Sequence, residues 1–323
     1  MNRAAVFLTI VTLATSIAIQ AQDEDEVIRV DSSLVVLNAT ITDLEGSPVS
    51  GLQRDRFSVF EDGLEQKIEF FSAEETPFAA VILIDTSGSM EGRVSMARAA
   101  AIRFLAGLRG SDAASIYHFD SKVTQVQDFS DLRDIDERVF ELKARGMTAL
   151  NDAIVKAAEE LSKRPEKRRA IIVLSDGADT SSRRSADYAL KAAQNVDAII
   201  YTVDMSAMDG GRQMQNIGVL KNFAEKTGGR FVATPGGAQM RQAFEQIVAE
   251  LGTQYTIAYD PKNTAQDGKW RTIELRVARK NLYIRTRKGY HAPKVQKPVR
   301  KRAQRSTLGA GFTNPPHYRP IQR

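Results

Sequence analysis

The chain has 323 residues, of which 42% are hydrophobic and 26% are charged, with a formal net charge of +5 and no cysteine. Such a composition is typical of a globular protein, long enough for two domains, and without cysteine neither a disulfide nor a lipid-modified cysteine anchor can form. Because eight Lys or Arg and no acid lie between Lys294 and Arg323, the remainder is slightly acidic, which excludes a general nucleic-acid-binding role.

The first residues have the features of a secretory signal peptide, which we predict for residues 1–21. Arg3 precedes the apolar run AAVFLTIVTLATSIAI, and small residues near Ala21 offer a cleavage position. The alternative is an uncleaved membrane anchor, but this run of about 16 residues is shorter than the roughly 20 needed to cross a bilayer. We therefore expect an exported protein of the periplasm, the cell surface or the extracellular space.

Residues 24–77 are predicted to form the first half of a small β-sandwich. Alternating apolar residues in SLVVLNATITD direct one face of a strand toward a core, and Glu45-Gly46 and Asp62-Gly63 are hairpin signals. This segment supplies about four strands. A sheet of that size on its own is marginally stable, so we expect it to need a partner sheet.

Residues 78–252 change to a pattern of strands alternating with helices. Apolar runs such as AAVILI, RAIIVLS and DAIIYTV are separated by amphipathic stretches such as TALNDAIVKAAEELSK. Helical crossovers of this length connect parallel strands, and nearly continuous apolar runs indicate strands covered on both faces. The predicted fold class is therefore α/β, with a doubly wound, mostly parallel sheet.

After the last helix, the strand pattern returns over residues 253–292, in TQYTIAYDP, WRTIELRVAR and LYIRTRKGYHA. We predict that 24–77 and 253–292 fold together as one β-sandwich into which the α/β domain is inserted. The alternative is two independent small sheets at either end of the α/β domain, which is less favourable because isolated small sheets are marginal. Residues 293–323 form a basic tail, which we predict to be disordered.

Oxygen-bearing side chains gather after the strands of the α/β segment, where ligands bind in such sheets. The first group follows AAVILI in the stretch DTSGS, the second is Thr148 in GMTALNDA, and the third is Asp176 in SDG, after RAIIVL. Gly88 permits the first loop to curl, so that residues at alternate positions face one point. The candidate metal ligands are Asp85, Ser87, Ser89, Thr148 and Asp176.

Two carboxylates and three hydroxyls are ligands for a hard cation. Mg²⁺ binds oxygen and commonly takes one or two carboxylates, and Mn²⁺ or Ca²⁺ is an alternative. Zinc requires His or Cys in most sites, whereas the three histidines of this chain, at 118, 291 and 317, are scattered. We therefore predict a Mg²⁺ site.

With these five residues in this order, the segment resembles the von Willebrand factor A (VWA) domain, and the residues match its metal-ion-dependent adhesion site. The flanking GSPVSGLQRDRFSVFEDGLEQKI, YTIAYDP and YIRTRKGYHAP resemble a family of exported bacterial VWA-related proteins known from acidobacteria. The resemblance implies a non-enzymatic adhesion module whose cation binds an Asp or Glu of a partner protein. It also implies that Asp85 and Asp176 hold the metal, one of them through water.

Each of these residues has a simpler interpretation when taken alone. Ser89 or Thr148 would serve as a helix cap, and Asp176 before glycine would form a turn. Asp179 would either orient water or be a solvated turn residue, and His118 would lie either at a partner-facing rim or in a plain loop. The Met-rich stretch VDMSAMDGGRQMQ would contact a partner or be a mobile loop.

A metal-dependent phosphoryl-transfer or hydrolytic enzyme using Asp85 is the alternative function. Such an aspartate would need a second carboxylate two positions on, where this chain has Ser87, and no general base is evident. A nucleophilic serine is also disfavoured, because neither Ser87 nor Ser89 lies in a Gly-x-Ser-x-Gly motif. The basic residues of 294–305 form a further candidate site, for weak contact with an anionic surface.

Overall fold

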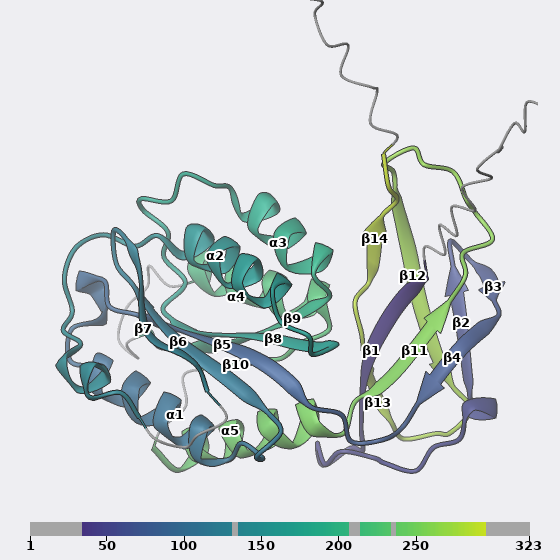
Figure 1. Ribbon diagram of the computed structural model, residues 1–323, viewed down its shortest axis with the longest axis horizontal. Helices are drawn as coiled ribbons and strands as arrows, with labels where there is room; N and C mark the ends of the chain where they lie inside the picture. Colours follow the sequence, from purple (N-terminus) through teal and green to yellow (C-terminus); the bar gives the residue numbers. More distant parts are fainter. Residues whose placement is uncertain (1–33, 131–134, 207–213, 234–236, 295–323) are drawn as a thin grey trace, which may run out of the picture. The chain divides into compact units, whose positions relative to one another are not determined.

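The computed structural model describes residues 34–130, 135–206, 214–233 and 237–294 (Figure 1). They belong to one compact unit that begins at Leu34. The predicted signal peptide, and the predicted tail beyond Lys294, lie outside the described residues. No helix in the described ranges is long and apolar enough to cross a membrane.

A six-stranded sheet forms the centre of the α/β part, with the strand order β10-β9-β8-β5-β6-β7. All neighbouring pairs are parallel except β6 and β7, so the predicted doubly wound, mostly parallel sheet is confirmed. The strands are β5 (Phe78–Asp85), β6 (Ala113–Phe119), β7 (Val123–Ser130), β8 (Arg168–Ser175), β9 (Ala198–Asp204) and β10 (Phe231–Val232).

Helices cover both faces of this sheet, because the central strand β5 is apolar on both sides and every residue of it is buried. Ile82 and Ile84 pack in one cluster with residues of α1 and α5, whereas Val81 and Leu83 pack in another with residues of α2, α3 and α4 (Figure 1). The helices are α1 (Val94–Ala106), α2 (Leu150–Ser162), α3 (Ala186–Asn195), α4 (Met214–Thr227) and α5 (Gly237–Gly252).

Two four-stranded antiparallel sheets make up the β part, and each combines strands from both sides of the α/β segment. One has the order β13-β1-β11-β4, and the other has the order β14-β12-β2-β3. Their strands are β1 (Val35–Thr42), β4 (Ile68–Ser72), β11 (Tyr255–Tyr259) and β13 (Tyr283–Arg285), then β2 (Phe57–Glu61), β3 (Leu64–Gln66), β12 (Trp270–Val277) and β14 (Gly289–His291).

The first strand, β1, alternates between apolar and polar residues as expected, but its polar face is buried instead of exposed to solvent. Leu37 and Ile41 of β1 pack in the core of the β part, with Ile257 and Tyr259 of β11. The opposite face of β1 is polar yet buried: the Thr40 hydroxyl accepts a hydrogen bond from the Gln254 side-chain amide at 3.4 Å. Both faces of this strand are therefore covered, one by apolar packing and one by polar contacts.

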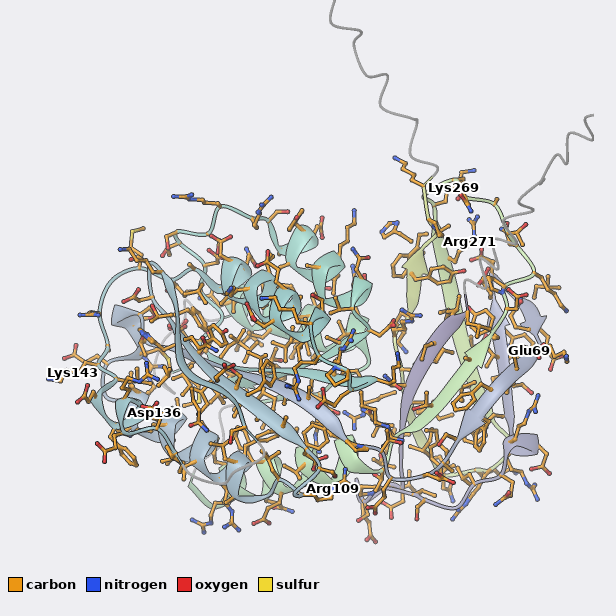
Figure 2. The ribbon with its side chains drawn as sticks, viewed as in Figure 1. Glu69, Arg109, Asp136, Lys143, Lys269 and Arg271 are labelled. Atoms are coloured by element: carbon orange, nitrogen blue, oxygen red, sulfur yellow. The ribbon has the colours of Figure 1, made fainter. Side chains whose placement is uncertain are left out.

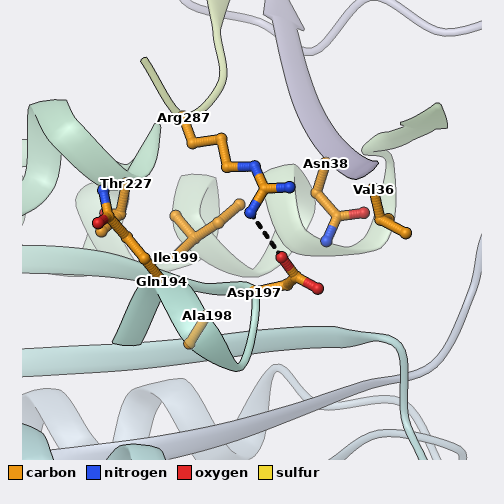
Figure 3. Close-up of a pocket in the computed structure, with 8 residues that line it drawn as sticks. All are labelled: Val36, Asn38, Gln194, Asp197, Ala198, Ile199, Thr227 and Arg287. Carbon is orange, nitrogen blue, oxygen red and sulfur yellow. Dashed lines mark hydrogen bonds and ion pairs between the residues drawn. The ribbon is translucent and has the colours of Figure 1, made fainter. Parts of the chain in front are cut away.

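Ion pairs lie on that polar side of β1. The Arg287 guanidinium meets the Asp197 carboxylate at 2.7 Å, beside Asn38 of β1 (Figure 3). Glu250, near the end of α5, pairs with Arg230 and with Arg285 of β13. Among these groups the Glu250 carboxylate is buried, and a buried charge is costly without such partners.

Arg168, at the start of β8, is fully buried. It connects the two segments through which the chain passes between the β part and the α/β part. Its guanidinium donates to the carbonyl oxygen of Gly252 at 2.9 Å, at the end of α5, and to that of Gln254 at 2.5 Å, just after this helix. It also donates to the carbonyl oxygen of Glu74 at 2.8 Å, in the segment that leads into β5. Burial lowers the pKa of Arg168 to about 10, so the group remains charged at neutral pH.

Candidate metal centre

Asp85 ends β5 at the carboxyl edge of the sheet, where ligand-binding loops begin in this fold class. Its side chain is fully buried. The Oδ1 atom accepts a hydrogen bond from the backbone N–H of Ser87 at 2.8 Å, and Oδ2 accepts one from the Ser175 hydroxyl at 2.6 Å. The carboxylate is therefore oriented by its own loop and by the end of the neighbouring strand.

Ser89 lies in the short 3-10 helix Gly88–Met90 that follows β5, and Ser87 directly precedes this helix; their hydroxyl oxygens are 3.1 Å apart. Neither hydroxyl makes a capping bond to a helix. The N-cap position of α1 is Arg93, and no side-chain capping bond forms there or at Ser87. The simpler capping interpretation of these serines therefore fails, and the two hydroxyls remain next to each other beside Asp85.

The second loop, which carries Thr148, is fixed to the first loop by backbone hydrogen bonds. The N–H of Arg145 donates to the carbonyl of Thr86 at 2.7 Å, and the N–H of Gly88 donates to the carbonyl of Gly146 at 3.0 Å. Thr148 itself is buried, and it is not the N-cap of α2, a position that Ala149 occupies without a side-chain bond.

The third loop begins at Asp176, directly after β8, and is bonded to the second. The carbonyl of Thr148 accepts hydrogen bonds from the N–H groups of Thr180 and Ser181, each at 2.9 Å. The Asp176 carboxylate accepts from the N–H of Ala178 at 3.1 Å, so this residue does form the turn that its sequence suggests. It is also buried, and its negative charge acts on Asp85.

The electrostatics at this edge favour a cation. Burial, with a smaller contribution from the charge of Asp176, raises the pKa of Asp85 to about 6, even though hydrogen bonds from Ser175 and Ser87 stabilise its carboxylate. Within the described residues, neither aspartate forms an ion pair with Lys, Arg or His. A bound cation would supply the missing positive charge, and it would meet carboxylate and hydroxyl oxygens.

Among the described residues, the side chains at this edge do not form a metal site of the kind that is built mainly from His, Cys, Asp and Glu. In the part of the chain that the structure describes, no group of three or more His, Cys, Asp or Glu side chains is placed to hold a metal ion. A cation here would rely on two carboxylates and the hydroxyls of Ser87, Ser89 and Thr148, which suits Mg²⁺ or another hard ion better than zinc.

Neighbouring residues have structural roles that the sequence did not reveal. Asp179 accepts the N–H of Asn151 at 2.9 Å and that of Ser182 at 3.0 Å, so it supports the start of α2 from another loop. Asp152, in the first turn of α2, accepts the N–H groups of Arg183 and Arg184, each at 3.0 Å, and so ties the third loop to this helix.

His118 and Met205 also differ from the simplest expectations. His118 Nδ1 lies 2.9 Å from the Thr86 hydroxyl, and burial lowers the pKa of this imidazole, so it supports the first loop as a neutral group. Met205 is buried in the core with Val203, which corrects the prediction that it lies in a mobile or partner-binding loop. Met208 lies outside the described residues, as does the side chain of Met214.

Ser175 is the functional candidate that sequence reasoning missed. In the sequence it stands out only as the residue before Asp176, but its hydroxyl donates to Asp85 and also accepts the N–H of Gly177 at 3.0 Å. The signal for this role in the sequence is that Ser175 ends an apolar strand, as Asp85 does, so parallel strands would place the two side chains at the same edge of the sheet.

Residues 80–178 match the family described as von Willebrand factor type A domain. The α/β part has a VWA-like fold. The matched range contains all five candidate ligands, from Asp85 to Asp176. The heavy chain H3 of inter-alpha-trypsin inhibitor from Bos taurus is 24% identical over 221 residues, which are 62% of this chain and 24% of that protein. The chain thus spans about a quarter of that relative's length.

The solved structures that are similar to this chain share little sequence with it. A von Willebrand factor type A protein from Catenulispora acidiphila is 15% identical with a TM-score of 0.46, over 79% of this chain and 73% of that one. The vWF domain of the type V pili tip protein Mfa5 from Porphyromonas gingivalis is 15% identical with a TM-score of 0.46, over 55% of this chain and 95% of that one.

Proposed function

We propose that this chain is an exported, non-enzymatic protein-interaction module of the VWA type. In this proposal a divalent cation binds Asp85, Ser87, Ser89, Thr148 and Asp176, and through the cation the module binds an Asp or Glu of a partner protein. The observation that carries the proposal is the buried Asp85 carboxylate, which faces the charge of Asp176 and has no cationic side chain paired with it in the described ranges.

The partner's carboxylate follows from the charge of the donor set. Two protein carboxylates can neutralise a divalent cation only if both are ionised and both lie close to it. If one of them acts through water, the ion keeps an unsatisfied charge and an exchangeable position. An incoming Asp or Glu would gain a charge-assisted bond there, so cation and carboxylate would each strengthen the binding of the other.

The proposal assigns the cation as Mg²⁺, with Mn²⁺ or Ca²⁺ as alternatives, because hydroxyl and carboxylate oxygens suit all three. Ser175 would not bind the ion but would orient Asp85 by its hydrogen bond. The chemistry that the cation would supply is Lewis-acid attraction for a carboxylate. The residues of this chain would hold it and exclude bulk water from Asp85.

Catalysis finds less support in the same geometry. The residue two positions after Asp85 is Ser87, which cannot act as a carboxylic acid or base, and His118 is engaged with Thr86. The export prediction, the relation to exported bacterial VWA-related proteins and the anionic-surface contact of 294–305 belong to the same proposal. The export prediction and the anionic-surface contact rest on sequence that lies almost entirely outside the described residues, whereas the relation to exported bacterial proteins rests on flanking sequence that lies within them.

A linkage experiment tests the proposed mode of binding. Mg²⁺ is titrated calorimetrically into chelator-stripped protein in chloride buffer and in acetate buffer of equal ionic strength, with the Mg²⁺–acetate equilibrium measured separately. Acetate stands in for the partner's side chain. We expect Mg²⁺ to bind several-fold more tightly in acetate in the wild type but not in Asp85→Ala. Equal affinity in both buffers would contradict carboxylate capture by the cation.

A further inference from the structure

A groove of about 710 Å³ opens beside the candidate metal loops, at the outer strand of the central sheet. One wall is Thr124, Gln125 and Val126 of β7, and the other is the segment from Arg138 to Arg145. That segment begins in a short 3-10 helix, Glu137–Glu141, and leads directly into the loop of Thr148.

The groove is connected to the metal loops by hydrogen bonds. Arg145 lines the groove, and its backbone N–H donates to the carbonyl of Thr86, the residue between Asp85 and Ser87. His118, another lining residue, lies 2.9 Å from the Thr86 hydroxyl through Nδ1. A partner segment that places a carboxylate on the cation would therefore find this groove next to its point of attachment.

The strand wall suits an extended segment. β7 is the last strand in the order of the central sheet, so its outer edge pairs with no strand among the described residues. Thr124 and Gln125 are exposed on this edge. The N–H and C=O groups of a free strand edge can pair with an added peptide, which is a common mode of peptide recognition.

The lining of the opposite wall holds three basic residues and one acidic residue, and two of the basic residues are paired with acids outside the lining. Lys143 is exposed and points outward at the margin of the α/β part (Figure 2), and it forms no ion pair in the described ranges. The Arg145 side chain is 78% exposed and lies 3.5 Å from Asp120. Arg138 is neutralised by Asp136 at 2.7 Å, and Glu141 is the acidic residue of the lining.

We propose that this groove binds an acidic, extended segment of the partner protein that continues from the carboxylate held by the cation. The inference rests on the proposed function and adds the chemistry of the partner beyond a single acid. Lys143 would attract its acidic side chains, and the edge of β7 would pair with its backbone. Specificity would come from the residues flanking the metal-bound acid, since a cation alone accepts any carboxylate.

The test uses two fluorescent peptides of about ten residues, each with one central Asp, flanked on one side by Glu residues or by Ser and Gly. Binding to the full mature protein is followed by fluorescence anisotropy in Mg²⁺ and in chelator. The variant is Lys143→Glu. The matched control is Lys191→Glu, a charge reversal at another exposed lysine, on α3, and circular dichroism verifies that both variants are folded.

In Mg²⁺ we expect the acidic peptide to bind the wild type about five- to tenfold more tightly than the neutral one, as one or two partly screened charge contacts would give. This preference should vanish in Lys143→Glu and persist in Lys191→Glu. The groove proposal would be overturned by any of three results. The wild type could bind both peptides equally, the preference could survive in Lys143→Glu, or neither peptide could bind.

The two proposals fail in different ways. If both peptides bind equally and only with Mg²⁺, the groove proposal is wrong while the metal-dependent function stands. If the acidic peptide binds equally in Mg²⁺ and in chelator, and Lys143→Glu abolishes this binding, the groove is supported and the cation-mediated function is wrong.

Discussion

The Ser175 hydroxyl donates a 2.6 Å hydrogen bond to the Asp85 carboxylate, so the ends of β8 and β5 are joined at the candidate metal site. This bond fixes the direction of the carboxylate that the proposal assigns to the cation. Residues that orient metal ligands commonly contribute 10- to 100-fold to metal affinity. We therefore expect Ser175→Ala to weaken Mg²⁺ binding by about tenfold or more, as measured by calorimetry.

Ser115→Ala is the matched control for this variant. Ser115 is also a buried serine in a strand of the same sheet, and its hydroxyl donates to the carbonyl of Gln127 at 2.7 Å, on β7. Both variants lose one buried hydrogen bond, which typically contributes about 1 kcal/mol to stability. If the two lower Mg²⁺ affinity equally, the orienting role of Ser175 is wrong.

The charge at Asp85 should make the metal-free protein less stable above pH 6. The folded chain keeps the Asp85 proton up to about pH 6, whereas the unfolded chain loses it near the ordinary pKa of 3.8. Between these values the folded state binds more protons, so the stability from this group is present at low pH and is lost as pH rises. A shift of this size corresponds to at most roughly 3 kcal/mol.

The Asp85→Asn side chain cannot ionise, so this variant should not lose stability at this position as the pH rises. In urea unfolding of chelator-stripped protein, we expect the variant to gain stability relative to the wild type between pH 4 and pH 7.5. A difference between variant and wild type that is the same at both pH values would contradict the desolvation of Asp85. Added Mg²⁺ should then stabilise the wild type and not the variant, because only the wild type binds the ion in this account.

Arg168 should be among the most sensitive positions for folding. Its guanidinium is fully buried and donates to the carbonyls of Gly252, Gln254 and Glu74. Arg168→Met would leave these carbonyls without a donor, and we expect it to lower the free energy of unfolding by about 3 kcal/mol or more. Arg103→Ala removes a pair with Glu245 in which both side chains are about half exposed, and it should cost less than about 1 kcal/mol. Equal losses in the two variants would argue against the role of Arg168.

Gly177, next to Asp176, should not tolerate a side chain. Its φ is +79°, and an added Cβ would lie 2.5 Å from the carbonyl oxygen of Asn216 in α4. Gly92 has a similar φ of +78° but open space around it. We expect Gly92→Ala to cost about 1 kcal/mol for the backbone conformation alone. Gly177→Ala should cost clearly more, and equal losses in thermal or urea unfolding would contradict the predicted clash.

The parallel sheet was predictable because its signal is local. AAVILI, RAIIVLS and DAIIYTV are apolar along their whole length, and strands covered by helices on both faces require this. β7 was not predicted, because it lies at the sheet edge and reads VTQVQDFS, with few buried residues to set a pattern. An edge strand owes its place to pairing with β6, which a single sequence does not display.

The positions of Asp85 and Asp176 in the fold could be predicted from the sequence, but the residues that support them could not. Asp85 and Asp176 stand directly after apolar strands, so their position at one edge follows from parallel topology. The supports were not predictable, since Ser175, Asp179 and Arg168 act across long stretches of chain. The assignment of the five ligands and the division of the chain at residues 77 and 252 remain predictions.

The most direct test of the central claim is calorimetric titration of Mg²⁺ and Mn²⁺ into the mature, chelator-stripped protein, beside an Asp85→Ala, Asp176→Ala double variant shown to be folded. The account predicts one cation-binding site in the wild type and none in the double variant. Binding of equal affinity in both proteins, or no binding to the wild type even in acetate, would contradict a cation site on Asp85 and Asp176.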